Sequence, residues 1–162
     1  MNLRFIFYIK KTIIHIKLNW GGNNMFKWKE EFSVGIDKFD KQHKKLLKLG
    51  QELLYSFENV EEGIDQYDKI IKVLNEMHDY TVYHFNSEEE IMEKYNYPEI
   101  NKHKKAHQQF VDKLEEIEPK KIDLNQKGFS MELINFIANW IENHIMGEDQ
   151  KYKSFLKNKN IE

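Results

Sequence analysis

Five histidines and one glutamate of this chain stand where helical periodicity predicts buried side chains: His43, His84, Glu88, His103, His107 and His144. Two pairs among them are spaced four residues apart, which places both members of a pair on one helix face. Burying such a group without a partner costs about 1–3 kcal/mol or more, and a small domain has only about 5–15 kcal/mol of net stability. The six groups must therefore be satisfied together, and shared metal ions would do so.

Each of these residues alone also has an ordinary structural explanation. A lone His43 is more often a hydrogen-bonded core histidine than a ligand. Histidines four residues apart, such as His103 and His107, arise by chance in helices. The pair His84/Glu88 is also explained by a hydrogen bond on a helix surface. What favours a metal site is that the histidines come from four separate helical stretches.

The four stretches are separated by turn signals in a chain with only two prolines and seven glycines. Apolar residues at steps of three and four predict helices over about 39–57, 64–94, 100–117 and 128–156. Short connections between such helices predict an all-α fold, an up-down-up-down antiparallel four-helix bundle. An irregular N-terminal arm, Phe26 to Asp37, precedes it.

This topology brings the histidines to one end of the bundle. His43 lies early in the first helix, and His84 lies late in the second. His103 and His107 lie early in the third helix, and His144 lies late in the fourth. Antiparallel packing therefore predicts that all five rings meet at one level. His15 and His78 are not expected to take part: His15 is in the N-terminal segment, and His78 is one step off its stripe.

The ligand types indicate which metal would bind. Five imidazoles with one or two carboxylates exceed the four ligands of a typical zinc site, and calcium and magnesium prefer oxygen ligands. A mixed set suits iron or another transition metal, and helical bundles use carboxylates to bridge paired irons. The residues therefore favour a dinuclear iron site.

Composition excludes several other classes of function. With 25 Lys+Arg against 27 Asp+Glu, the net charge of -2 argues against nucleic-acid binding. The chain has no cysteine, so disulfides, iron–sulfur clusters and thiolate zinc sites are excluded. The lack of cysteine also fits a reducing compartment, and we expect a cytoplasmic protein.

Residues 1–24 differ from the rest, being apolar and basic with no acidic residue. Their basic residues break every apolar run short of the ~20 residues that span a bilayer, so no membrane association is expected. The codons for Trp20 to Asn24 can contain a ribosome-binding sequence just before Met25. Our hypothesis is that residues 1–24 are translated leader or disordered and that residues 25–162 form the helical domain. The alternative is a basic amphipathic helix at a membrane surface.

Four sequence blocks together resemble the bacterial members of the hemerythrin family, from about Phe26 to Phe155. The blocks are Trp28 with Phe32-Ser33-Val34-Gly35-Ile36 and Asp40-Lys41-Gln42-His43; His84-Phe85-Asn86-Ser87-Glu88-Glu89; Tyr97-Pro98 with His103-Lys104-Lys105-Ala106-His107; and Trp140-Ile141 with His144-Ile145 and Asp149. The resemblance implies reversible dioxygen binding at two iron ions, for storage, delivery or sensing, and not an enzyme.

The resemblance also implies a role for each residue. One iron is expected on His103, His107 and His144, and the other on His43 and His84 with one coordination position open for dioxygen. Glu88 and Asp149 are the expected bridging carboxylates, with a solvent-derived oxo or hydroxo group as the third bridge. By position, Ile141 is expected to form a wall of the oxygen pocket.

One ligand remains ambiguous from the residues alone. Glu148, four residues after His144, would reach the same face of a regular helix more easily than Asp149 does. The family pattern selects Asp149, and either a π-type bulge or a local loosening of the helix would accommodate the extra residue.

Two other functions compete with oxygen binding: a di-iron oxidase or scavenger of nitric oxide or peroxide, and an iron reservoir or sensor. Delivery would imply an oxygen-requiring enzyme as partner, and we expect a monomer or a weak homo-oligomer.

Overall fold

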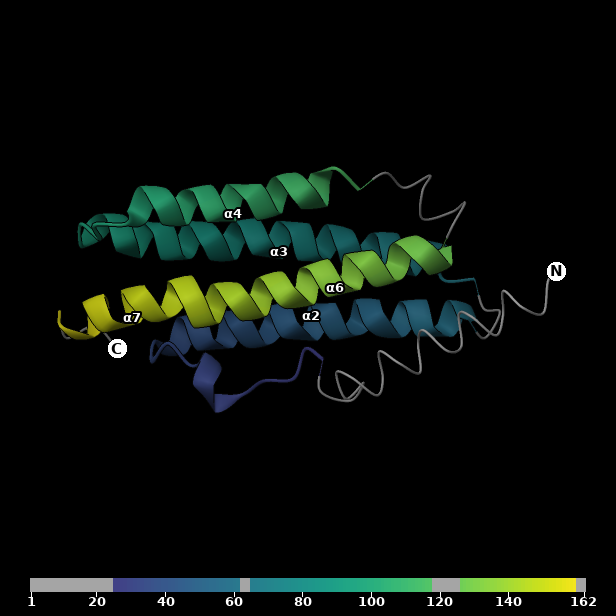
Figure 1. Cartoon of the computed structure of the whole chain (residues 1–162), viewed down its shortest axis with the longest axis horizontal. Helices are drawn as coiled ribbons and strands as arrows, with labels where there is room; N and C mark the ends of the chain where they lie inside the picture. Colours follow the sequence, from purple (N-terminus) through teal and green to yellow (C-terminus); the bar gives the residue numbers. More distant parts are fainter. Residues whose placement is uncertain (1–24, 62–64, 118–125, 160–162) are drawn as a thin grey trace.

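The computed structural model describes residues 25–61, 65–117 and 126–159, and within them it is an all-α four-helix bundle (Figure 1). Its elements are η1 (Glu30–Phe32), α2 (Asp37–Glu61), α3 (Tyr67–Lys94), α4 (Ile100–Glu115), α6 (Gln126–His144), the π-helical segment η2 (Ile145–Asp149) and α7 (Gln150–Lys157). The last three elements are consecutive and form one continuous rod, so the described residues form four rods in all. The predicted fold class, an all-α four-helix bundle, is therefore confirmed. The leader hypothesis and His15 lie outside the described residues.

The four rods run alternately in opposite directions along the long axis of the molecule (Figure 1). Helix α2 packs against α3 and α6, and α3 packs against α4. The observed helices agree with the predicted ranges to within a few residues at each end, as expected for boundaries read from a pattern. None of the described helices is both long and apolar enough to cross a bilayer.

The turn between α3 and α4 determines where α4 begins. The backbone N–H of Asn96 donates to Glu93 O, and that of Tyr97 donates to Met92 O at 2.8 Å. Asn96 has a φ of 57°, so these bonds form the left-handed C-terminal cap that closes many helices. Buried Tyr97 then anchors the turn, and α4 starts close enough to carry His103 and His107 back along α3.

The N-terminal arm is folded against the bundle. It contains one 3-10 turn, η1, where the sequence predicts only irregular structure. Lys29 pairs with Glu142 of α6 at 2.6 Å. The ring of Phe26 lies where a side chain on Gly50 of α2 would stand, so only glycine permits this close approach. The arm therefore covers one side of the bundle near the middle of α2.

Two apolar clusters fill the interior. The larger apolar cluster contains Leu49, Leu53, Ile70, Met77, Phe110, Ile134, Ile137, Ile141 and eleven other buried residues. The smaller apolar cluster consists of Val34, Ile36, Phe39, Met92, Tyr97, Tyr152 and Leu156. Along every rod, the predicted metal residues are flanked on one side by the larger cluster. On the other side they are flanked by the smaller cluster or by residues packed on it. The polar residues thus form a layer enclosed between two apolar regions.

Candidate metal centre

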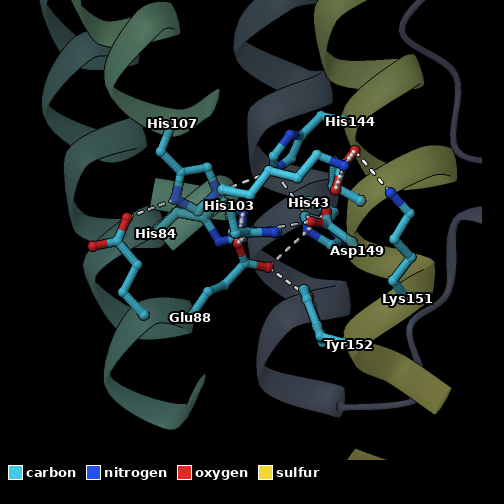
Figure 2. A network of polar contacts seen from close by, with 12 residues as sticks. His43, His84, Glu88, His103, His107, His144, Asp149, Lys151 and Tyr152 are labelled. Atoms are coloured by element: carbon cyan, nitrogen blue, oxygen red, sulfur yellow. Dashed lines mark hydrogen bonds and ion pairs between the residues drawn. The ribbon is translucent and has the colours of Figure 1, made fainter. Parts of the chain in front are cut away.

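The structure brings all seven predicted metal residues together in one buried layer between the four rods (Figure 2). This metal layer consists of His43, His84, Glu88, His103, His107, His144 and Asp149, and no member exposes more than 6% of its surface. The rings meet at one level, as the antiparallel topology predicts. Their roles as ligands remain predictions.

The ligand atoms fall into two groups that share Glu88. The three-histidine group is His103, His107 and His144 with Glu88, and the two-histidine group is His43 and His84 with Glu88; within each, one ligand atom per residue lies within 4.8 Å of the others. The division matches the expected assignment of three histidines to one ion and two to the other.

Both carboxylates reach both groups. Asp149 Oδ2 lies 3.3 Å from Nε2 of His43, whereas its Oδ1 lies 3.2 Å from Nε2 of His144. Glu88 Oε1 lies 3.5 Å from Nε2 of His43, and its Oε2 lies 3.4 Å from Nε2 of His107. Asp149 therefore directs one oxygen toward each group, and Glu88 contacts both groups as well, with its Oε2 also 3.6 Å from Nε2 of His84. Contact with both groups is what a bridging ligand requires.

The hydrogen bonding of the layer is incomplete without an ion. Both ring nitrogens of His43 and of His103, both oxygens of Asp149 and Oε2 of Glu88 are buried without a hydrogen-bond partner. Each such atom costs about 1–3 kcal/mol. Nε2 of His107 lies 3.0 Å from Nε2 of His144, about the distance between two nitrogens that bind one ion at right angles through bonds of about 2.1 Å. The residues present therefore fit a pair of metal ions.

The electrostatics of the layer also favour cations. Burial lowers the pKa of His43, but the carboxylates of Asp149 and Glu88 outweigh it and raise this pKa to about 10. Burial lowers the pKa of His84 to about 4, so that ring is neutral. Burial and the Glu88 charge raise the pKa of Asp149, but His144 and His43 outweigh them and lower it to about 2. Two anionic carboxylates beside these rings would attract divalent ions.

The ambiguity between Glu148 and Asp149 is resolved geometrically by the π-helical segment. Because η2 inserts one extra residue into the turn, Asp149 is fully buried in the layer. Glu148 instead points outward, where its Oε1 lies 3.2 Å from Lys102 and 2.9 Å from Lys151. The expected π-type bulge is therefore confirmed, and it places Asp149 rather than Glu148 beside His144.

Two other expectations concern residues around the layer. His78 is a third exposed and contacts Asp79 and Glu115, so it lies outside the layer as predicted. Ile141 is buried in the larger apolar cluster, one turn before His144. Its contribution to an oxygen pocket remains a prediction.

Sequence reasoning missed three residues that hold the layer in place. The hydroxyl of buried Tyr152 donates to Oε1 of Glu88 at 2.5 Å. Gln42 Oε1 lies 3.1 Å from Nδ1 of His84, and Glu89 Oε1 lies 2.8 Å from Nδ1 of His107. One signal was available: Tyr152 follows Asp149 by three residues, which places both on one helix face.

Stacked aromatic rings support two of the histidines. Phe85 stacks on His107 with a centroid distance of 3.6 Å and an interplanar angle of 3°. Trp140 stacks on His144 at 4.3 Å and 12°. Each stacked aromatic ring therefore restricts the orientation of the histidine that it covers, on the side that faces the larger apolar cluster.

Comparison with known proteins agrees with this geometry. Residues 34–156 match the family model of the hemerythrin HHE cation-binding domain. The chain is also similar to a protein named bacteriohemerythrin from Clostridium acetobutylicum, with 37% identity over 131 residues. That alignment covers 79% of this chain and 98% of the relative.

Proposed function

The chain belongs to the hemerythrin family, and from that premise we propose that it binds dioxygen reversibly at two non-haem iron ions. Hemerythrins are oxygen-binding proteins rather than enzymes. The observation that carries the proposal is the metal layer itself, in which five imidazoles and two carboxylates are buried at one level with several ligand atoms unpaired.

We assign the ligands according to the two groups of the layer. His103, His107 and His144 would hold one iron, and His43 and His84 would hold the other with a position open for dioxygen. Glu88 and Asp149 would bridge the pair, together with a solvent-derived oxo or hydroxo group. The support is that each carboxylate faces both groups.

When bound, the iron pair supplies the electrons that dioxygen accepts and returns. The chain's own residues set the conditions for that exchange. Imidazoles are neutral donors, so a set of five with only two carboxylates leaves less negative charge at the metals than a carboxylate-rich site would. The apolar clusters on both sides exclude water from the layer. Ile141, one turn before His144, would form part of the pocket wall.

A di-iron oxidase or scavenger is the second candidate. Catalysis on a second substrate would need a general base or positioning group close to the open iron. Among the described residues, the polar side chains that hydrogen-bond to the layer, buried Tyr152 and Gln42 and half-buried Glu89, are all engaged by layer residues. The geometry therefore favours binding over onward chemistry.

Iron analysis with visible spectroscopy tests the proposal. We expect two irons per chain and, in air, a charge-transfer band that disappears under vacuum and returns on re-exposure. Rapid conversion to the diferric form that vacuum does not reverse would support redox chemistry instead. Purified protein that contains no transition metal and takes up none would overturn the proposal.

The physiological role remains part of the proposal. Storage, delivery and sensing all require the same reversible site, and delivery implies an oxygen-requiring enzyme as partner. We further propose that the protein acts in the cytoplasm as a monomer or weak homo-oligomer.

A further inference from the structure

We propose that Glu89 is a positioning residue that makes the three-histidine group the tighter of the two metal sites, and that Gln42 leaves the two-histidine group the weaker one. This inference rests on the proposed function and adds an order of metal loading to it. The two groups differ in the hydrogen-bond acceptors that face the outer ring nitrogens of their histidines.

Glu89 holds His107 from outside the layer. Its Oε1 lies 2.8 Å from Nδ1 of His107, so Nδ1 carries the proton and donates it. The remaining nitrogen, Nε2, then keeps its lone pair free for a metal ion, and it lies 3.0 Å from Nε2 of His144 and 3.4 Å from Glu88 Oε2. A histidine whose outer nitrogen donates to a carboxylate is fixed in one tautomer and is a more basic ligand.

The position of the His107 ring is further restricted. Phe85 covers one face in a parallel stack, and Lys104 lies 3.7 Å from the second oxygen of Glu89. Glu89 itself exposes only 18% of its side chain. The acceptor is therefore a partly shielded anion held in one place, which strengthens its hydrogen bond relative to one made in water.

The two-histidine group has no such anion. Nδ1 of His84 lies 3.1 Å from Oε1 of Gln42, a neutral amide oxygen. The amide nitrogen of Gln42 reaches Ser87 only at 3.5 Å. Nδ1 of His43 has no hydrogen-bond partner. Among the described residues, neither ring of this group has a carboxylate behind its outer nitrogen.

Charge-assisted hydrogen bonds are roughly twice as strong as neutral ones. Losing a partner of this kind typically reduces metal affinity by about 10–100-fold. Glu89 should therefore raise affinity at the three-histidine group alone, because its carboxylate contacts only His107 within the layer. The ion held there would bind first and leave last.

Calorimetric titration of the metal-free protein with Co²⁺ under anaerobic conditions tests this. We expect two resolved binding steps in the unaltered chain. Glu89→Gln should weaken the tighter step by about 10–100-fold and leave the weaker step within about threefold. Gln42→Glu should strengthen the weaker step. Glu89→Asp, which keeps the charge, should restore part of the lost affinity and serves if Glu89→Gln fails to fold.

Glu93→Gln is the matched control. Glu93 lies one turn along α3 and also pairs with Lys104, but it is exposed and contacts no ring of the layer. Its substitution removes the same charge and should leave both steps unchanged. In the metal-free protein, nitrogen NMR should show His107 protonated at Nδ1, and Glu89→Gln should weaken that preference.

The possible failures are distinguishable. If the unaltered chain binds neither Co²⁺ nor iron, the proposed function is overturned together with this inference. If it binds two ions but Glu89→Gln weakens both steps equally, or acts no more strongly than Glu93→Gln, only the inference is overturned. The same holds if His107 proves to be protonated at Nε2 in the metal-free protein.

Discussion

The larger apolar cluster and the metal layer occupy adjacent parts of one bundle but differ in what they need. The cluster is built from aliphatic and aromatic side chains that need no partner beyond one another, such as Leu53, Ile70 and Ile137, all fully buried. The layer removes two carboxylates and five imidazoles from water and leaves several of their atoms unpaired. The apolar regions therefore supply the stability of the fold, whereas the layer lowers the stability unless it binds metal.

Of the changes considered, metal removal should have the largest effect on the stability of the metal layer relative to the larger apolar cluster. At a metal concentration about 100 times its dissociation constant, each bound ion stabilises the fold by about 2.7 kcal/mol. We expect chelation to cost at least that much free energy of unfolding. Amide hydrogen exchange should accelerate most around His103 and in η2, and least around Ile70 and Leu53. Equal acceleration throughout would show that the two regions are not energetically separate.

Substituting a proposed bridging carboxylate should have the next largest effect. Asp149→Ala removes a fully buried carboxylate that faces both groups, so we expect loss of the proposed iron pair, measured as iron per chain. Glu148→Ala is the control, because that side chain contacts Lys102 and Lys151 outside the layer. It should keep both irons and change stability by no more than about 1 kcal/mol. The reverse pattern would mean that the wrong carboxylate has been assigned.

The contrast between the two regions also explains how much the sequence alone could predict. Steps of three and four residues identify the buried face of each helix, and polar residues on that face, such as His43, stand out because they are costly there. The antiparallel order of the helices then brings them to one level. The bundle and six of the seven layer residues follow from pattern and topology, whereas Asp149 follows from the family resemblance.

The features that the sequence could not predict depend on the direction in which individual side chains point. Periodicity gives no reason to prefer Asp149 over Glu148, because the π-helical segment shifts the register by one residue. It also cannot reveal that Glu89, next to Glu88, turns toward His107 on α4. Phe26 reaches Gly50 with a φ of 61°, a conformation that no local pattern in the arm predicts.

Tyr152→Phe tests the boundary between the layer and the smaller apolar cluster. The substitution keeps a ring of the same shape among its apolar neighbours but removes the hydroxyl that donates to Glu88. A hydrogen bond to a charged group contributes about 1.5–3 kcal/mol, and we expect a loss of that order in urea unfolding of the metal-free protein. Tyr55, which is 54% exposed, provides the control: Tyr55→Phe should change stability by less than about 0.5 kcal/mol. Equal effects of the two substitutions would show that the contact with Glu88 contributes nothing.

The smallest effect should come from the one described histidine outside the layer. The hydrogen bond that the His78 ring donates to the Asp79 carboxylate, opposed by burial and aided by Glu115, raises the pKa of His78 above its ordinary value of 6.5. A raised folded-state pKa means that protonated His78 contributes its full stability below pH 6.5 and loses it as the pH rises through the folded value. Urea unfolding of the metal-saturated protein and of His78→Gln should therefore differ more at pH 6 than at pH 8. Because the pair is near the surface, this difference should change by less than about 1 kcal/mol. A difference that stays the same at both pH values, or one that is larger at pH 8, would mean that protonated His78 gains no stability from Asp79 and Glu115.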